Sequence, residues 1–212
     1  MSIVWLQKSH PARDSQCCCK INLLLPGACQ DIYLSNMDIE HLRYPTGKYI
    51  FPQVVNQAQI NAWVDTIEAF PARIRNLVES LSNQRLEARY REGGWTIRQV
   101  VHHVADSHLN SYIRFKWTLT EDRPTIKTYD QEAWGKRPDA VQGDVAMSLK
   151  LLEGLHERWV YVLRGLTEEE RSRKFFHPEK QMELDLNWLI GLYAWHCNHH
   201  AAHIELALNS PA

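Results

Sequence analysis

Four long segments of this 212-residue chain repeat their apolar residues at helical spacing, and strand-like alternation is nearly absent from the sequence. The segments are residues 58–81, 96–120, 144–166 and 185–208. Apolar side chains that recur every three or four residues lie along one face of a helix, and that face must be buried against another element. Four such faces without a sheet predict an all-α fold, a four-helix bundle. Residues 121–142 are polar and contain two prolines, so we expect a long loop that crosses the bundle and not a plain up-and-down arrangement.

Helix-breaking and capping residues mark the limits of these segments. Pro71 lies inside the first pattern, so the predicted helix is either kinked or divided there. Gly93 and Gly94 form a break before the second helix, and the side chain of Thr96 is suited to cap it. Thr167 begins the sequence TEEE, which predicts a capping box and a short helix, followed by a loop at FFHPEK.

The first 36 residues differ from the rest of the chain. They lack apolar periodicity, and Pro11 and Pro26 would interrupt a helix. We therefore expect residues 1–36 to be a disordered extension or a misassigned start, and residues 37–212 to form one domain.

Charge, hydropathy and cysteine content exclude several classes of protein. A net charge of -1 gives no basic surface, so nucleic acid is not an expected partner. No apolar run reaches the eighteen residues that a membrane-spanning helix needs, so we expect no membrane partner. Four of the five cysteines precede residue 36, which leaves the predicted domain with Cys197 alone. A domain that cannot form an internal disulfide fits the reducing cytoplasm, where we expect this protein to act.

Seven of the eleven histidines fall in two short stretches, VVHHVADSH and WHCNHHAAH. Imidazole is the commonest protein ligand for zinc, nickel and related ions. The second stretch occupies core positions of the predicted fourth helix, where an unpartnered imidazole costs about 1–3 kcal/mol. A single histidine there would be read as a hydrogen-bonded core residue. A cluster of this density predicts a metal site, because a bound ion uses each ring as a ligand.

Spacing leaves the choice of ligands open. Two pairs on the predicted fourth helix are four residues apart and so share a helix face: His196 with His200, and His199 with His203. The partner on the second helix is His102 or His103. His103 lies nearer the apolar stripe, whereas His102 is expected at the surface. His108 is expected either beside a ligand or at the surface.

Other residues near the clusters have two interpretations each. Asp106, three residues after His103, could act as a general base or orient a ligating imidazole, or it could form a salt bridge with a nearby cation. Arg114 could contact an anionic substrate or form an ion pair between helices. Cys197 is expected to be a packed small residue and not a nucleophile. The chain contains no HExxH motif, which argues against peptidase activity.

The sequences GGWTIRQVVHHVADSHLNSYIRF and GLYAWHCNHHAAHI resemble the two characteristic helices of the YfiT-type proteins of the DinB superfamily. LRYPTGKY near residue 42 is similar to their N-terminal stretch, and the resemblance covers about residues 42–208. It implies a DinB-like four-helix bundle that holds one divalent metal ion, zinc first and nickel second, through three histidines. By position in the motifs, those ligands are His103, His199 and His203.

The resemblance implies a metal-dependent hydrolase that acts on a small molecule, with the three-histidine metal activating a water molecule. Superfamily relatives transfer low-molecular-weight thiols such as bacillithiol or glutathione, so a metal-dependent thiol S-transferase is the alternative. A non-catalytic metal-binding stress protein is the alternative from another class. We further expect a homodimer, as is common for small helical bundles.

Overall fold

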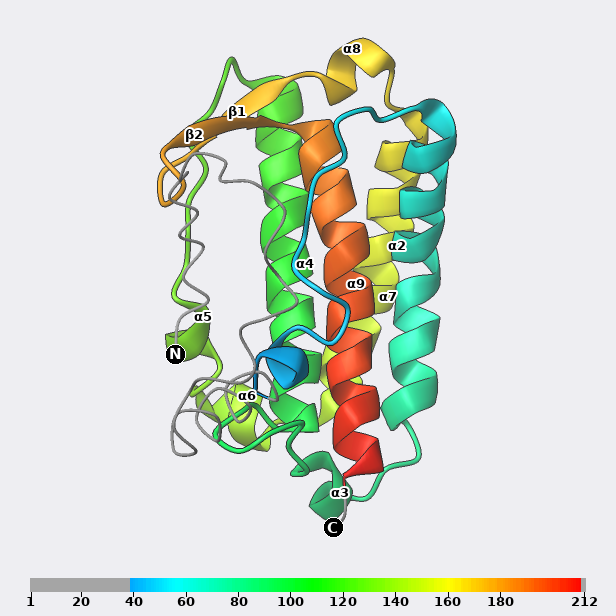
Figure 1. Cartoon of the computed structure of the whole chain (residues 1–212), viewed down its shortest axis with the longest axis vertical. Coiled ribbons are helices and arrows are strands. Elements are labelled where there is room, and N and C mark those ends of the chain that lie inside the picture. The colour runs from blue at the N-terminus through cyan, green and yellow to red at the C-terminus, as the bar shows by residue number, and fades with distance from the viewer. Residues whose placement is uncertain (1–38, 211–212) are drawn as a thin grey trace, which may run out of the picture.

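The computed structural model describes residues 39–210 and is built around four long helices (Figure 1). They are α2 (Gln57–Val78), α4 (Ile97–Thr120), α7 (Val145–Gly165) and α9 (Leu186–Asn209). Helix α9 packs between α2 and α4, and α7 packs against the same two helices on the other side. The predicted four-helix bundle is therefore confirmed, with the large buried side chains of Trp159, Phe70 and Phe115 at its centre.

Helices α4 and α7 run in the same direction, so the chain must return along the length of the bundle between them (Figure 1). This connection contains the short helices α5 (Gln131–Trp134) and α6 (Pro138–Gln142). It is fixed to the beginning of α4, because Gln99 Nε2 donates to the Gly135 carbonyl at 2.8 Å and Arg98 Nη1 donates to the Gly143 carbonyl at 2.7 Å. The predicted crossing loop is thus confirmed.

A small hairpin closes one end of the bundle, where the sequence predicted only a loop at FFHPEK. Strands β1 (Lys174–His177) and β2 (Met182–Asp185) pair antiparallel, and they follow the short helix α8 (Glu168–Arg171) (Figure 1). The opposed residues Phe175 and Leu184 are 0% and 7% exposed, so they attach the hairpin to the core. The loop prediction was wrong because four-residue strands are too short to show alternation.

Pro71 neither divides α2 nor leaves a carbonyl unsatisfied. The helix is continuous from Gln57 to Val78 with Pro71 inside it. A proline has no N–H for the carbonyl four residues earlier, which here is that of Ile67. His156 on α7 bonds to this carbonyl instead, with 2.7 Å between its Nδ1 atom and the oxygen.

In the part of the chain that the structure describes, no helix combines the length and apolar character needed to cross a membrane. The short helix α3 (Asn83–Leu86) precedes the turn into α4.

Candidate metal centre

Two well-capped helices carry the histidine clusters. Thr96 caps helix α4 as predicted, and it does so within a capping box: Gln99 N donates to Thr96 Oγ1 at 3.1 Å, and Thr96 N donates to Gln99 Oε1 at 3.0 Å. Helix α9 begins at Asp185, whose carboxylate accepts from Trp188 N at 2.8 Å. Because α4 and α9 pack directly against each other, the two clusters meet inside the bundle.

The structure forms two overlapping groups of histidines whose ligand atoms all lie within 4.8 Å of one another. The first joins His103 of α4 to His196 and His200 of α9, and the second contains three residues of α9 alone: His199, His200 and His203. The ring centroid of His103 lies 5.5 Å from that of His196 and 4.8 Å from that of His200. The ligand set predicted by position takes one residue from the first group and two from the second, and it stays a prediction.

Burial keeps these imidazoles neutral. Loss of solvation, aided by neighbouring histidines, lowers the pKa of His103 and of His199 to about 3. Loss of solvation also lowers the pKa of His203 to about 4, and it holds the pKa values of His196 and His200 well below the usual range. Neutral rings have one nitrogen lone pair each, which is the form that binds a metal ion.

Two ring nitrogens in the clusters are buried without a hydrogen-bond partner among the described residues. They are Nε2 of His103 and Nδ1 of His199. An unmade hydrogen bond at such a group costs about 1–3 kcal/mol. A divalent cation of the zinc or nickel type removes this cost, because imidazole nitrogen is a preferred ligand for both. The residues present therefore fit a bound metal ion.

Aromatic rings surround the clusters. Trp95 lies 4.5 Å from His103, Tyr90 stacks on His203 at 4.0 Å, and Trp195 stacks on His199 at 4.4 Å, all between ring centroids. The segment before α2 adds Tyr44, whose ring centroid is 6.0 Å from that of His199. These aromatic rings therefore pack around the candidate metal centre.

Asp106 has the protonation behaviour of a group that can accept a proton near neutral pH. Burial, with a smaller contribution from Asp139, raises the pKa of the Asp106 carboxyl to about 6. None of the ion pairs between described residues includes Asp106. Its neighbour Tyr129 is also buried, which raises the pKa of that phenol, and Asp106 adds to the effect. The salt-bridge alternative for Asp106 therefore has no partner in the described structure.

Arg114 likewise lacks an ion-pair partner among the described residues. Its Nη2 atom donates to the Lys127 carbonyl at 3.0 Å in the crossing loop, and its buried Nε atom has no partner there. The expected interhelical ion pair is not formed by these residues.

The prediction that His102 lies at the surface was wrong. It is 6% exposed, with Nδ1 at 2.8 Å from Ser148 Oγ and Nε2 at 3.2 Å from the Gly143 carbonyl. The surface alternative for His108 is excluded, since this side chain is 0% exposed. Cys197 is 1% exposed and burial raises the pKa of its thiol, which agrees with a packed residue that is not a nucleophile.

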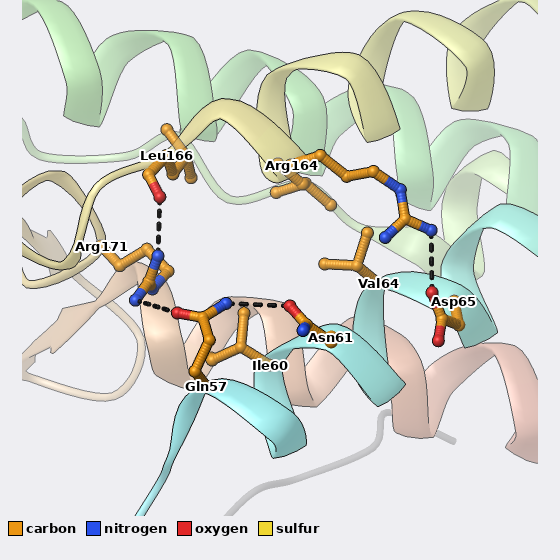
Figure 2. Close-up of a pocket in the computed structure, with 9 residues that line it drawn as sticks. Gln57, Ile60, Asn61, Val64, Asp65, Arg164, Leu166 and Arg171 are labelled. Carbon is orange, nitrogen blue, oxygen red and sulfur yellow. Dashed lines mark hydrogen bonds and ion pairs between the residues drawn. The ribbon is translucent and has the colours of Figure 1, made fainter.

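Two cavities at the surface of the described residues lie apart from these histidines. One has a volume of about 330 Å³ and lies between α2 and the end of α7, where Arg171 donates to Gln57 and Arg164 pairs with Asp65 (Figure 2). The other has a volume of about 340 Å³ and includes Trp195, the neighbour of the second histidine group. No histidine lines either cavity.

Comparison with known proteins connects this centre to a family. The model of the DinB superfamily matches residues 66–204. "Putative metal-dependent hydrolase YfiT" of Bacillus subtilis (strain 168) is 45% identical over 164 residues, which are 77% of this chain and 92% of the relative. "Putative metal-dependent hydrolase" of Bacillus cereus (strain 03BB102) is 48% identical over 163 residues, which are 77% of this chain and 93% of the relative.

A solved structure of YfiT from Bacillus subtilis superimposes on this chain with a TM-score of 0.77 at 45% identity. The match covers 79% of this chain and 97% of that one, and the structure is described as having "an unusual four-helix bundle topology". In this chain the parallel pair α4 and α7 and the long connection between them differ from a plain up-and-down bundle. The chain belongs to the DinB superfamily and is of the YfiT type.

Proposed function

We propose that this protein is a hydrolase of small molecules that depends on one divalent metal ion held by His103, His196 and His200. The observation that carries the proposal is the first histidine group: three neutral imidazoles from two helices with their ligand atoms within 4.8 Å of one another. The unpartnered Nε2 atom of His103 supports it, and so do the names of the Bacillus relatives.

Hydrogen bonds outside the centre favour this set over one that contains His203. Nε2 of His203 lies 3.2 Å from the Arg43 carbonyl, which can only accept, so this nitrogen carries the proton of the neutral ring. The remaining lone pair of His203, on Nδ1, faces Nδ1 of His200 at 3.4 Å and accepts a hydrogen from it. His203 thus has both nitrogens engaged, and His200 is left with a lone pair on Nε2.

A bound zinc or nickel ion supplies Lewis acidity, which lowers the pKa of water and polarises a substrate carbonyl. The protein's own groups then bind, orient and accept protons. Asp106, with a pKa of about 6, is largely ionised at pH 7 and would accept the proton that water loses during hydrolysis. Trp95 and Tyr90, beside the histidines, would exclude bulk water from the centre.

Metal content of purified, tag-free protein tests the proposal. We expect about one zinc or nickel ion per chain in the parent and loss of that ion in His103→Ala, His196→Ala and His200→Ala. His102→Gln is the matched control, since it alters a buried histidine of α4 outside both groups, and it should retain the ion. Retention of metal by His196→Ala and His200→Ala with loss in His199→Ala and His203→Ala would favour the set predicted by position.

Activity separates hydrolysis from thiol transfer at the same centre. The metal-loaded protein should cleave esters or amides in a screen that contains no added thiol, and His103→Ala should not. A strict requirement for a low-molecular-weight thiol would contradict the hydrolase proposal.

A further inference from the structure

A row of three histidines leads from the core of the bundle to His196; His156 and His108 are buried, and His196 is partly buried. His156 of α7 contacts His108 of α4, with 2.7 Å between Nε2 of the first and Nδ1 of the second. His108 in turn contacts His196 of α9, with 3.0 Å between Nε2 and Nδ1. Three long helices therefore contribute one ring each, and the last ring belongs to the proposed metal site.

The row begins at the carbonyl that Pro71 leaves free. Because Pro71 has no N–H, the Ile67 carbonyl receives its hydrogen bond from His156 Nδ1 at 2.7 Å. A carbonyl oxygen can only accept, so Nδ1 of His156 carries a hydrogen. Burial lowers the pKa of His156 to about 4, so the ring is neutral and its Nε2 atom has a lone pair.

The position of the hydrogen on each ring determines its position on the next ring in the row. The lone pair on His156 Nε2 requires a hydrogen on Nδ1 of His108, and the His108 ring is 0% exposed, so a charged form of it would be costly. His108 Nε2 is then an acceptor, which requires a hydrogen on Nδ1 of His196. The neutral His196 ring is left with its lone pair on Nε2. In the metal-free chain Ser107 Oγ, 3.4 Å away, can donate to that lone pair, a long contact that a bound metal ion would replace.

Packing holds the rings in this orientation. Phe70 lies against both His108 and His156, with ring centroids 5.1 Å and 5.8 Å apart, and Trp159 meets the same two rings edge-on. Both histidines are almost completely buried, at 0% and 2% exposed. A ring that turned over would leave a buried N–H facing another N–H, which costs about 1–3 kcal/mol.

We propose that His156 and His108 are positioning residues that fix His196 with its Nδ1 atom protonated and its Nε2 lone pair directed to the metal ion. This inference rests on the proposed metal site. Metal-binding histidines commonly donate their second nitrogen to a carbonyl or carboxylate, and loss of that partner costs about 10- to 100-fold in metal affinity or activity. Here two further imidazoles stand between the ligand and the carbonyl that sets the arrangement.

Nuclear magnetic resonance of the metal-free parent, labelled with ¹⁵N in its histidine rings, tests the arrangement without any variant that must fold. The spectrum shows directly which nitrogen of each ring carries the hydrogen. We expect His156, His108 and His196 all to be protonated on Nδ1, a form less usual for free histidine. Protonation of His196 on Nε2 as the main form would overturn the proposal, whatever metal the protein binds.

Two substitutions of one residue then separate positioning from packing. His156→Gln places an amide oxygen where Nε2 accepts from His108, so zinc affinity measured with a competing chelator should stay within about threefold of the parent. His156→Leu removes both polar atoms, so we expect zinc affinity to fall about 10- to 100-fold and the His196 ring signals to show mixed protonation. His102→Leu is the matched control, because it removes a buried histidine of α4 outside the row, and its zinc affinity should not change.

The experiments distinguish an error in the proposed metal site from an error in the proposed role of His156 and His108. If His196→Ala binds zinc as well as the parent while the ring protonation is as expected, the proposed ligand set is wrong, and with it the role of the row in metal binding. If His196→Ala loses zinc but a folded His156→Leu binds it as tightly as the parent, the metal site stands and the positioning role is overturned.

Discussion

Gly191 of α9 lies so close to Trp63 of α2 that a Cβ atom added to it would be 2.9 Å from Cη2 of the indole ring. The same atom would be 2.6 Å from the hydroxyl oxygen of Tyr49. Real Cβ atoms do not approach so closely, so the Trp63 and Tyr49 side chains, or the backbone that carries them, would have to move. The closeness of α9, which carries four of the clustered histidines, to α2 thus depends on a missing side chain.

Gly191→Ala should therefore destabilise the protein, although alanine is the better helix former. We expect the free energy of unfolding in urea to fall by about 1–3 kcal/mol, the usual cost of overpacking. Gly154→Ala on α7 is the control, since nothing lies within 4 Å of its added Cβ atom. That variant should be more stable by about 0.5–1 kcal/mol. Equal effects of the two substitutions would contradict the close packing of α2 and α9.

Arg98 joins three parts of the chain at the beginning of α4. It is 5% exposed, and its guanidinium donates to Glu87 at 2.8 Å, to the Gly143 carbonyl at 2.7 Å and to Asn83 at 3.1 Å. Arg98→Met would remove all three hydrogen bonds of the buried guanidinium and release the end of the crossing loop. We expect a loss of about 2–4 kcal/mol in the free energy of unfolding.

Arg164→Met gives the comparison for Arg98. Arg164 pairs with Asp65 and Glu68, but these side chains are 43% exposed or more. An exposed ion pair contributes about 1 kcal/mol or less, so a loss in Arg164→Met as large as that in Arg98→Met would show that burial is not what distinguishes them.

Acid should destabilise the metal-free protein partly through His156. Its pKa is about 4 in the folded chain, against an ordinary value of about 6.5 in the unfolded chain. Between these pH values the unfolded chain binds more protons than the folded chain. The contribution of His156 to the free energy of unfolding is therefore fully present above about pH 6.5 and is lost as the pH falls toward 4. His156 should contribute up to about 1.4 kcal/mol per pH unit to this fall. Unfolding in urea across this range should show a shallower fall in His156→Gln, and an unchanged slope would contradict the neutral ring.

The pH dependence of stability that Asp106 causes has the opposite sign, because folding raises the pKa of its carboxyl to about 6. The folded chain then binds more protons between about pH 4 and 6, so its stability falls as the pH rises through this range. Asp106→Asn removes the charge, and we expect the metal-free variant to be more stable than the parent above pH 6 by about 1 kcal/mol, allowing for the half-exposed carboxyl. Below pH 4 the two should be equally stable. The rate of hydrolysis by the metal-loaded variant should fall. A variant that gained both in stability and in rate of hydrolysis would contradict a role for Asp106 in proton transfer.

The helices and their capping residues could be predicted from the sequence because each depends on neighbours within a few positions. The capping boxes at Thr96 and Thr167 are both present. The predicted third helix is also present, but part of its apolar pattern is not buried. Met147 and Leu151 are 56% and 42% exposed, and the true buried face includes His156. A helical pattern does not reveal which side of an apolar stripe another helix covers.

Side chains whose surroundings come from distant parts of the chain could not be predicted. His102 was expected at the surface because α4 alone gives no sign that Gly143 and Ser148 cover it. The histidine clusters offered no reason to single out His156, because it is a lone histidine outside both of them. The sequence did contain one indication, since Pro71 inside a helix leaves a carbonyl that needs a donor from elsewhere. Only the packing of α7 on α2 shows which side chain supplies it.

The depth of His103 and His200, which are 4% and 3% exposed, bears on how fast an ion could be exchanged. An ion held by these rings leaves only when part of the surrounding structure opens, and the rate of loss is then set by that local unfolding, not by the strength of the metal–nitrogen bonds. Under this condition the ion found in the protein reflects which metal was available while the chain folded. The metal found in the protein in a cell then depends on which ion was available as much as on the affinity of the site.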